Sequence, residues 1–167
     1  MFVLGIDPGL SRCGYGAVRV DSAGRFVAEA AGVLRTDKDA PLPRRLSVLM
    51  ADLRSLMDEL QPDAVAVEKV FFQTNVRTAM SVGQASGIAL ALADGMGCEV
   101  GEYTANEVKA IVAGYGAATK EQVQRMVQSQ LNLAEIPRPP DAADALALAL
   151  THCTLGPRRA RMTAAAT

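Results

Sequence analysis

Cysteine and histidine are scarce in this sequence, and their placement argues against several kinds of site. The three cysteines, Cys13, Cys98 and Cys153, are an odd set, lie far apart and include no Cys-x-x-Cys pair. This spacing disfavours both a disulfide framework and a thiolate zinc site. We therefore expect buried thiols in a reducing compartment. The single histidine, His152, falls near the predicted C-terminus of a helix, where it is most simply a partner of the helix dipole, and we assign it no catalytic role.

No apolar run is long enough to suggest a membrane span. The most apolar window, residues 79–96, is rich in glycine and is interrupted by Gln84, Ser86 and Asp94, which is typical of a packed helix. The N-terminus lacks a charged segment followed by an apolar stretch and a cleavage site, so we do not expect secretion. The sequence predicts a cytoplasmic protein with no membrane partner.

The chain also lacks an excess of charge of either sign. It has 17 Lys and Arg against 18 Asp and Glu in 167 residues, so net charge neither suggests nor excludes a nucleic-acid partner. Local stretches are more informative, because residues 69–93 hold two basic residues and no acid, and three arginines but no acid follow Asp144. Locally basic surfaces are therefore possible. The length and the 50% hydrophobic content are those of a single globular domain.

Hydrophobic periodicity predicts an α/β fold with a five-stranded mixed sheet and helices on both faces. A helix between two strands makes them parallel in the simplest case, and capping-box patterns begin at Thr104 and Thr119. We expect one domain over residues 1–155 and a flexible basic tail over residues 156–167. The predicted strands are 2–6, 13–20, 25–34, 64–68 and 98–103, with a hairpin turn at 21–24, and the predicted helices are 41–60, 76–94, two that start near 104 and 119, and 141–152.

Asp7 stands at the end of the first predicted strand, directly before Pro8 and Gly9. Asp-Pro-Gly is good turn chemistry, because Asp bonds its own backbone, Pro sets φ and Gly allows positive φ. Taken alone, Asp7 is therefore a turn residue rather than a catalytic one. A functional interpretation needs other carboxylates that converge on the same place.

Three other acids are candidates for such convergence. Glu68 ends its strand as Asp7 does, and open α/β sheets place their sites outside the carboxyl ends of the strands. Asp141 and Asp144 are three residues apart at a helix start, so they share one face of the helix. Helix capping explains this pair equally well. It does not explain the surrounding alanines, which would let the helix start pack closely on a sheet and carry both carboxylates toward it.

Four carboxylates in one small site could not all ionise without a counter-charge. All-oxygen ligation without His or Cys suits Mg²⁺ or Mn²⁺. Two such ions that flank a phosphodiester would activate a water and stabilise the leaving oxygen. The sequence therefore predicts nuclease chemistry, with Asp7, Glu68, Asp141 and Asp144 as the candidate catalytic and metal-binding residues.

Three blocks of this sequence, taken in order and spacing, closely resemble the RuvC family, the Holliday junction resolvases of bacteria. The resemblance implies a ribonuclease H-like fold, a homodimer, and a Mg²⁺-dependent endonuclease that nicks two strands of a four-way junction symmetrically and leaves 5′-phosphate ends. It also implies that the RuvA-RuvB branch-migration complex is a partner. All four acids match the metal ligands of the family. The blocks are Gly5–Gly9 with Gly14–Gly16, Val67–Glu68 followed by Phe71 and Gly83–Ala85, and Asp141–Ala147.

The resemblance also implies DNA-binding positions. The family places an aromatic at Phe71 that stacks on a junction base, although an aromatic after a strand more often joins the core. Lys109 and Lys120 match basic positions that the family uses on DNA, and Lys120 in a first helical turn opposes the helix dipole. A solvated surface lysine is the alternative for each. Lys69 and Arg77 are weaker candidates.

Other interpretations remain open from the sequence. The Gly- and Ala-rich helix at 76–94 suits either core packing or a dimer contact. An actin-like or sugar-kinase ATPase also begins with Asp-x-Gly after a strand, but it needs a second glycine-rich phosphate loop that is not present. A ribonuclease H-like nuclease that acts on another nucleic acid, or a non-catalytic junction-binding module, would share the same fold.

Overall fold

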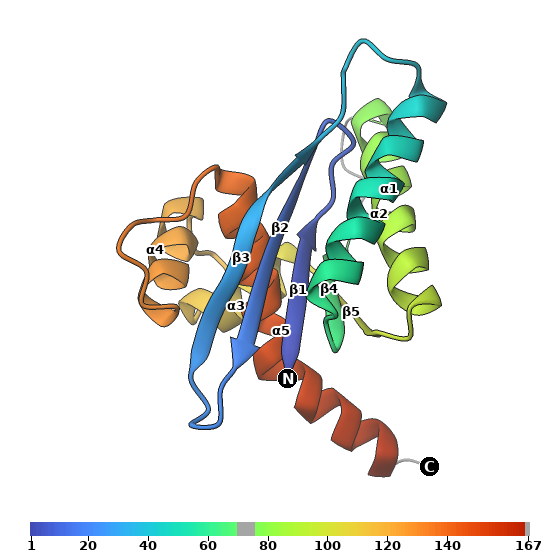
Figure 1. Ribbon diagram of the computed structural model, residues 1–167. Coiled ribbons are helices and arrows are strands. Elements are labelled where there is room, and N and C mark those ends of the chain that lie inside the picture. Colours follow the sequence, from blue (N-terminus) through green and yellow to red (C-terminus); the bar gives the residue numbers. More distant parts are fainter. Residues whose placement is uncertain (70–75, 166–167) are drawn as a thin grey trace.

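The computed structural model describes the backbone of residues 1–69 and 76–165, and the side chains of residues 1–69 and 79–157. Its five strands form one mixed sheet of order β3-β2-β1-β4-β5, in which β1, β2 and β3 are antiparallel and β4 and β5 run parallel to β1 (Figure 1). The predicted five-stranded mixed sheet is confirmed. The elements are β1 Phe2–Asp7, β2 Arg12–Val20, β3 Phe26–Arg35, α1 Leu42–Leu60, β4 Ala64–Glu68, α2 Val76–Gly95, β5 Glu99–Tyr103, α3 Ala105–Ala113, α4 Lys120–Gln130 and α5 Pro140–Ala165.

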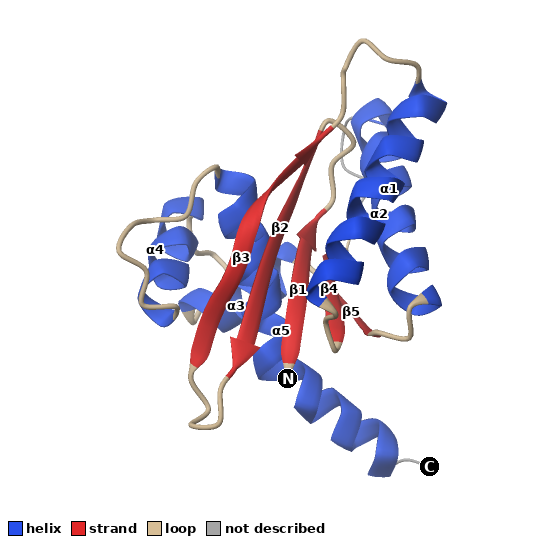
Figure 2. Ribbon diagram, in the orientation of Figure 1, coloured by secondary structure: helices blue, strands red, loops and turns tan. Residues whose placement is uncertain are grey.

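Helices cover both faces of the sheet, as predicted. Figure 2 shows α1 and α2 on one side and α3, α4 and α5 on the other. Each face has its own apolar core. Phe2, Leu4 and Ile6 pack toward α1 and α2, whereas Val3 packs toward α3, α4 and α5. Within the described ranges, no helix is long and apolar enough to cross a membrane.

The alternation of side chains along β1 and β4 directs both strand-end acids toward α5. In β4, Val65 and Val67 join the α1–α2 core, while Ala64 and Ala66 join the α5 core. Because successive residues of a strand point to opposite faces, Glu68 lies on the α5 face with Ala66. Asp7 lies on that face for the same reason, because Gly5, two residues earlier in β1, contacts α5.

Three glycines allow α5 to lie directly on the sheet. A Cβ atom at Gly5 would stand 1.9 Å from the backbone oxygen of Ala145, one at Gly14 would stand 2.2 Å from that of Asp141, and one at Gly16 would stand 2.6 Å from the nitrogen of Leu146. On the helix side, the alanines of α5 between residues 142 and 149 are buried. The predicted close packing of this helix start is confirmed, and it brings Asp141 and Asp144 to the strand ends.

The glycines of α2 differ from those of β1 and β2, which lie in close contact with α5. Within the described part of the chain, no atom of another element lies within 4 Å of a Cβ placed at Gly83 or Gly87. No described backbone of another element therefore packs directly against either glycine. Their surface is open.

The C-terminal helix and His152 require two corrections. The sequence predicted an irregular tail from Gly156, but α5 runs to Ala165, because the residues that follow Pro157 are mainly arginine and alanine, which are strong helix formers. His152 therefore lies inside the helix, so its role as a partner of the helix C-terminus is wrong. It is buried, with Nδ1 3.0 Å from the hydroxyl of Tyr103.

The cysteines follow the expectation in part. The thiols of Cys13 and Cys153 are buried and Cys98 is half-buried, and none forms a disulfide. Burial raises the pKa of both Cys13 and Cys153 to about 12, so neither thiol is a reactive nucleophile at neutral pH.

Candidate active site

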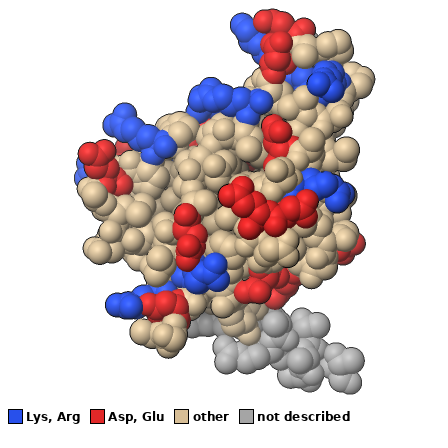
Figure 3. All heavy atoms as spheres, in the orientation of Figure 1, with Lys and Arg blue, Asp and Glu red and all other residues tan. Residues whose placement is uncertain are grey.

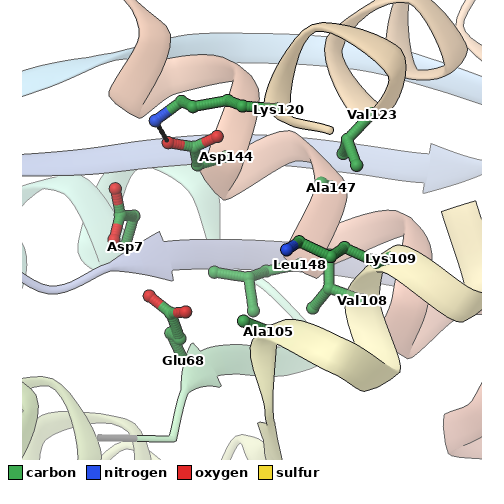
Figure 4. Close-up of a pocket in the computed structure, with 10 residues that line it drawn as sticks. All are labelled: Asp7, Glu68, Ala105, Val108, Lys109, Lys120, Val123, Asp144, Ala147 and Leu148. Atoms are coloured by element: carbon green, nitrogen blue, oxygen red, sulfur yellow. Dashed lines mark hydrogen bonds and ion pairs between the residues drawn. The ribbon is translucent and has the colours of Figure 1, made fainter. Parts of the chain in front are cut away.

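A cavity of about 410 Å³ opens at the carboxyl ends of β1 and β4. Five elements contribute charged side chains to it: Asp7 from β1, Glu68 from β4, Lys109 from α3, Lys120 from α4 and Asp144 from α5. Figure 4 shows the carboxylates of Asp7, Glu68 and Asp144 around one space, with the two lysines on the helix side. Three of the four predicted acids therefore meet in one cavity.

Burial and neighbouring negative charges raise the pKa values of the three acids that line this cavity. Burial, followed by the charges of Glu68, Asp144 and Asp141, raises the pKa of Asp7 from 3.8 to about 7. Burial and the charge of Asp144 raise the pKa of Glu68, against the lowering effect of Lys120. Burial also raises the pKa of Asp144, although Lys120 opposes it. A cation placed among these groups would relieve the crowding.

Two basic side chains already contact the helix acids. The Nζ of Lys120 donates to Oδ2 of Asp144 at 2.5 Å. The guanidinium of Arg12 donates to Oδ2 of Asp141 through Nη2 and through Nε, the latter at 3.1 Å. Burial lowers the pKa of Lys120, but its bond to Asp144 and the nearby acids raise it overall, so this side chain is cationic at neutral pH.

The position of Lys120 follows from local sequence. Thr119 caps α4, because its side chain accepts from the backbone N–H of Gln122 while the Gln122 side chain accepts from the N–H of Thr119. This capping box starts the helix at Lys120. The lysine then projects from the first turn into the cavity, where Asp144 offsets its unfavourable place at the helix N-terminus.

Asp141 lies at the edge of the site rather than in the cavity lining. It is not among the lining residues, but it is close enough to raise the pKa of Asp7. Among the described residues, no three His, Cys, Asp or Glu side chains stand close enough together, as positioned, to hold a metal ion. Lys120 and Arg12 each bond Oδ2 of one helix acid, so these two cations compete with a metal ion for the carboxylates of Asp144 and Asp141.

The donor set nevertheless fits a divalent metal. All four acids offer carboxylate oxygens, and no sulfur or imidazole ligand lines the described cavity, which is the donor chemistry of Mg²⁺ or Mn²⁺. Burial and, after it, the neighbouring carboxylates raise the pKa of Asp7, and a bound cation would counter both effects. Asp7, Glu68, Asp141 and Asp144 are the residues that would hold such an ion.

Only some of the predicted DNA-binding residues line the cavity. Lys109 and Lys120 line the cavity. Lys69 is exposed just after β4, with its N–H bonded to the backbone oxygen of Tyr103 at 2.8 Å. Arg77 lies in the first turn of α2, where only the backbone is described, and Phe71 lies outside the described residues.

Arg12 is the one charged residue of this site that the sequence interpretation missed. Its strand position could have revealed it, because Arg12, Gly14 and Gly16 alternate along β2 and the two glycines face α5. The side chain of Arg12 therefore points to the same face, next to Asp141. Its partner could not be predicted in the same way, because Asp141 lies 129 residues further along the chain.

Comparison with known proteins agrees with this geometry. The sequence profile described as crossover junction endodeoxyribonuclease RuvC matches residues 3–152. A protein of that name from Frankia alni is 52% identical over 166 residues, which cover 99% of this chain and 84% of that protein. The chain belongs to the RuvC family.

Solved RuvC structures match the fold as well. The structure of Thermus thermophilus RuvC superimposes with a TM-score of 0.86 at 38% identity and covers 95% of this chain and 96% of that one. A structure of T. thermophilus RuvC in complex with a Holliday junction substrate gives a TM-score of 0.87 at 39% identity, with 93% and 94% of the two chains covered. These matches confirm the predicted ribonuclease H-like fold. Membership of the RuvC family also implies divalent-metal-dependent catalysis.

Proposed function

We propose that this protein is a structure-selective endonuclease that resolves Holliday junctions during recombination and DNA repair. The observation that carries the proposal is the convergence of Asp7, Glu68 and Asp144 on one cavity, with Asp141 beside it. In this reaction a water attacks a phosphodiester phosphorus, and the 3′ oxygen leaves with a proton, so that a 5′-phosphate and a 3′-hydroxyl remain. A ligase can join such ends.

The proposed cofactor is Mg²⁺, with two ions for each active site and with Mn²⁺ as a substitute. When bound, the ions supply a more acidic water and stabilise charge on the leaving oxygen. The four acids would hold the ions, whose positive charge would offset the burial and the mutual repulsion that raise the pKa of Asp7. A metal ion that displaced Lys120 and Arg12 from Asp144 and Asp141 would leave both cations available to the negatively charged phosphate.

The DNA surface proposed from the family includes residues in and beside the cavity. Lys109 and Lys120 face the acids from two neighbouring helices, which places positive charge where a phosphate backbone would enter. We also propose Lys69, Arg77 and Phe71 as DNA-binding residues, with Phe71 stacking on a base. Their support is the resemblance to the RuvC family.

We propose that the protein acts as a homodimer in the bacterial cytoplasm and cooperates with the RuvA-RuvB branch-migration complex. Support for a dimer comes from the open, apolar groove between α1 and α2, which is lined by residues such as Leu46, Ile88 and Leu92. Met50 on the same groove is 46% exposed. We assign the nuclease domain to residues 1–155 and treat residues 156–167 as a basic C-terminal extension, of which residues 156–165 continue α5.

A cleavage assay tests the proposed function. The protein is offered a synthetic four-way junction and a linear duplex of matched sequence, each with Mg²⁺. We expect paired symmetric nicks in the junction and 5′-phosphate products, with little cutting of the duplex. Equal cutting of both substrates would favour a general ribonuclease H-like nuclease, and junction binding without cutting would favour a non-catalytic binding module.

A substitution at Arg12 tests its competition with metal. Arg12→Gln removes a positive charge beside Asp141, which should strengthen Mn²⁺ binding to the DNA-free protein by on the order of 1 kcal/mol, or about fivefold. A titration followed by electron paramagnetic resonance measures the affinity. The matched control is Arg19→Gln, also on β2, where the arginine pairs with Glu29 instead. Unchanged or weaker Mn²⁺ binding in Arg12→Gln would contradict the competition.

A further inference from the structure

A group of basic side chains surrounds the segment that joins β3 to α1. Arg35 ends β3, Lys38 lies in the following loop, and Arg44 and Arg45 lie in the first turn of α1. We refer to these four residues as the basic ridge. Asp37 and Asp39 lie in the same segment, and Asp37 accepts the backbone N–H of Asp39 at 2.9 Å. Figure 3 shows basic and acidic side chains together over this loop, at the top of the view.

The exposed members of the ridge have no anionic partner in the protein. Arg35, Lys38 and Arg44 are exposed. None of the three forms an ion pair with any described residue. In contrast, Arg12, Arg19, Arg25 and Lys120 each pair with an acid. The positive charge of the ridge is therefore available to a partner outside the chain.

Side-chain hydrogen bonds hold the backbone that carries the basic ridge. Arg45 donates from Nη2 to the Ser11 hydroxyl at 2.6 Å and from Nε to the Thr36 hydroxyl at 3.0 Å. The Thr36 hydroxyl in turn donates to the backbone oxygen of Leu10 at 2.6 Å. These bonds join the turn after β1, the end of β3 and the start of α1. The backbone that carries Arg35 and Arg44 is thus held in place before any ligand binds.

The first turn of α1 carries positive charge and lacks a side-chain cap. Pro41 precedes the helix and makes no side-chain cap bond, and no acidic residue lies in the first turn. Arg44 and Arg45 occupy that turn, although positive charge there opposes the helix dipole. Helix N-termini with free N–H groups and nearby cations are sites for phosphate and other anions.

The ridge adjoins the candidate active site through β2. Arg35 is the cross-strand partner of Arg12, and Arg12 contacts Asp141. Arg45 of the ridge bonds the side chain of Ser11, the residue before Arg12, so a phosphate backbone that passes Arg12 would come close to the ridge. Several cations in a series suit a chain of phosphates better than a single small anion.

We infer that the basic ridge binds the phosphate backbone of one double-stranded arm of the DNA substrate, next to the strand that is cut. This inference rests on the proposed function for the identity of the DNA, a four-way junction. The ridge contacts phosphates only, so it contributes affinity and orientation of the arm without reading the sequence. Its residues do not touch the reacting groups.

The salt dependence of DNA binding tests the ridge. The double variant Arg35→Gln/Arg44→Gln removes two exposed cations, so binding to a four-way junction without divalent metal should weaken about tenfold, and the slope of log K against log salt should fall by roughly 2. Cleavage at saturating protein should stay within about twofold of the wild type. Fluorescence anisotropy over a series of NaCl concentrations gives both binding quantities.

Two controls make the result specific. Arg25→Gln removes an exposed arginine at the opposite end of the β2–β3 hairpin and should leave the slope unchanged. Lys38→Gln, which replaces a single exposed residue, should lower the slope by about 1 and serves if the double variant folds poorly in a thermal melt. Affinities and slopes equal to those of Arg25→Gln would overturn the inference.

The same measurements separate this inference from the proposed function. If the wild-type protein binds junction and linear duplex equally and cuts neither, the proposed function fails, but the slope difference on duplex still supports the ridge as a phosphate surface. If the wild type resolves junctions and the ridge variants match it at every salt concentration, only the ridge inference fails. A wild type that binds no DNA overturns both.

Discussion

Asp7→Asn should reduce junction cleavage by at least about 1,000-fold and leave junction binding within about threefold of the wild type. The substitution keeps the size of the side chain but removes a negatively charged metal ligand at the centre of the cavity, where Asp7 interacts with the other three acids. Losing a group that stabilises the transition state typically lowers the rate by several powers of ten. Single-turnover cleavage and anisotropy binding with Mg²⁺ measure the two effects.

The matched control for this substitution is Asp58→Asn, which changes an exposed aspartate of α1 and should cleave as the wild type does. Cleavage by Asp7→Asn near the wild-type rate would show that Asp7 is only a turn residue. An equal loss of binding and cleavage would assign it to the DNA surface.

The stability of the wild type relative to Asp7→Asn should depend on pH in a defined direction. The pKa of Asp7 is raised from 3.8 to about 7 in the metal-free protein, so folding favours its protonated form. The wild type should therefore lose stability as the pH rises from about 4 to about 7, while Asp7→Asn loses nothing at this position. In urea unfolding with EDTA, the variant should match the wild type at low pH and exceed it by up to about 4 kcal/mol at pH 8. A difference that does not vary with pH would contradict the raised pKa of Asp7.

Gly5→Ala should unfold the protein more easily by about 3 kcal/mol or more and abolish cleavage. The new Cβ would stand 1.9 Å from the backbone oxygen of Ala145 and 2.8 Å from the backbone nitrogen of Ala149. Neither atom belongs to a flexible side chain, so α5 must move away from β1, and overpacking of this kind is strongly destabilising. The movement would also displace Asp141 and Asp144, which α5 carries. Denaturant unfolding and the cleavage assay measure the two losses.

Gly95→Ala provides the comparison for this effect. A Cβ atom at Gly95, the last residue of α2, meets no atom of the described chain within 4 Å. This second substitution should be neutral or slightly stabilising, because alanine favours a helix over glycine. If both variants were equally stable and active, the close contact between α5 and the sheet would not be what positions the helix acids.

Much of the fold could be predicted because its signals are local. The strand Ala64–Glu68 is an unbroken apolar run that ends at a polar residue, and the structure has the same bounds. The capping boxes at Thr104 and Thr119 correctly marked the starts of α3 and α4, since each depends on residues only three positions apart. The end of α5 was missed because Gly156 and Pro157 resemble a stop signal, although helix-forming residues follow them.

The sequence by itself determined which residues end the strands, which residues start the helices, and that four of the acids fall at such ends. These features depend on short stretches of chain, where backbone geometry and side-chain alternation decide the result. Only the tertiary structure decided that Lys120 holds Asp144, that Arg12 holds Asp141 across 129 residues, and that Arg35 stands opposite Arg12 in the sheet. Such pairings form because glycines in the sheet admit α5 at close range, and close packing between distant segments has no local signal in a sequence.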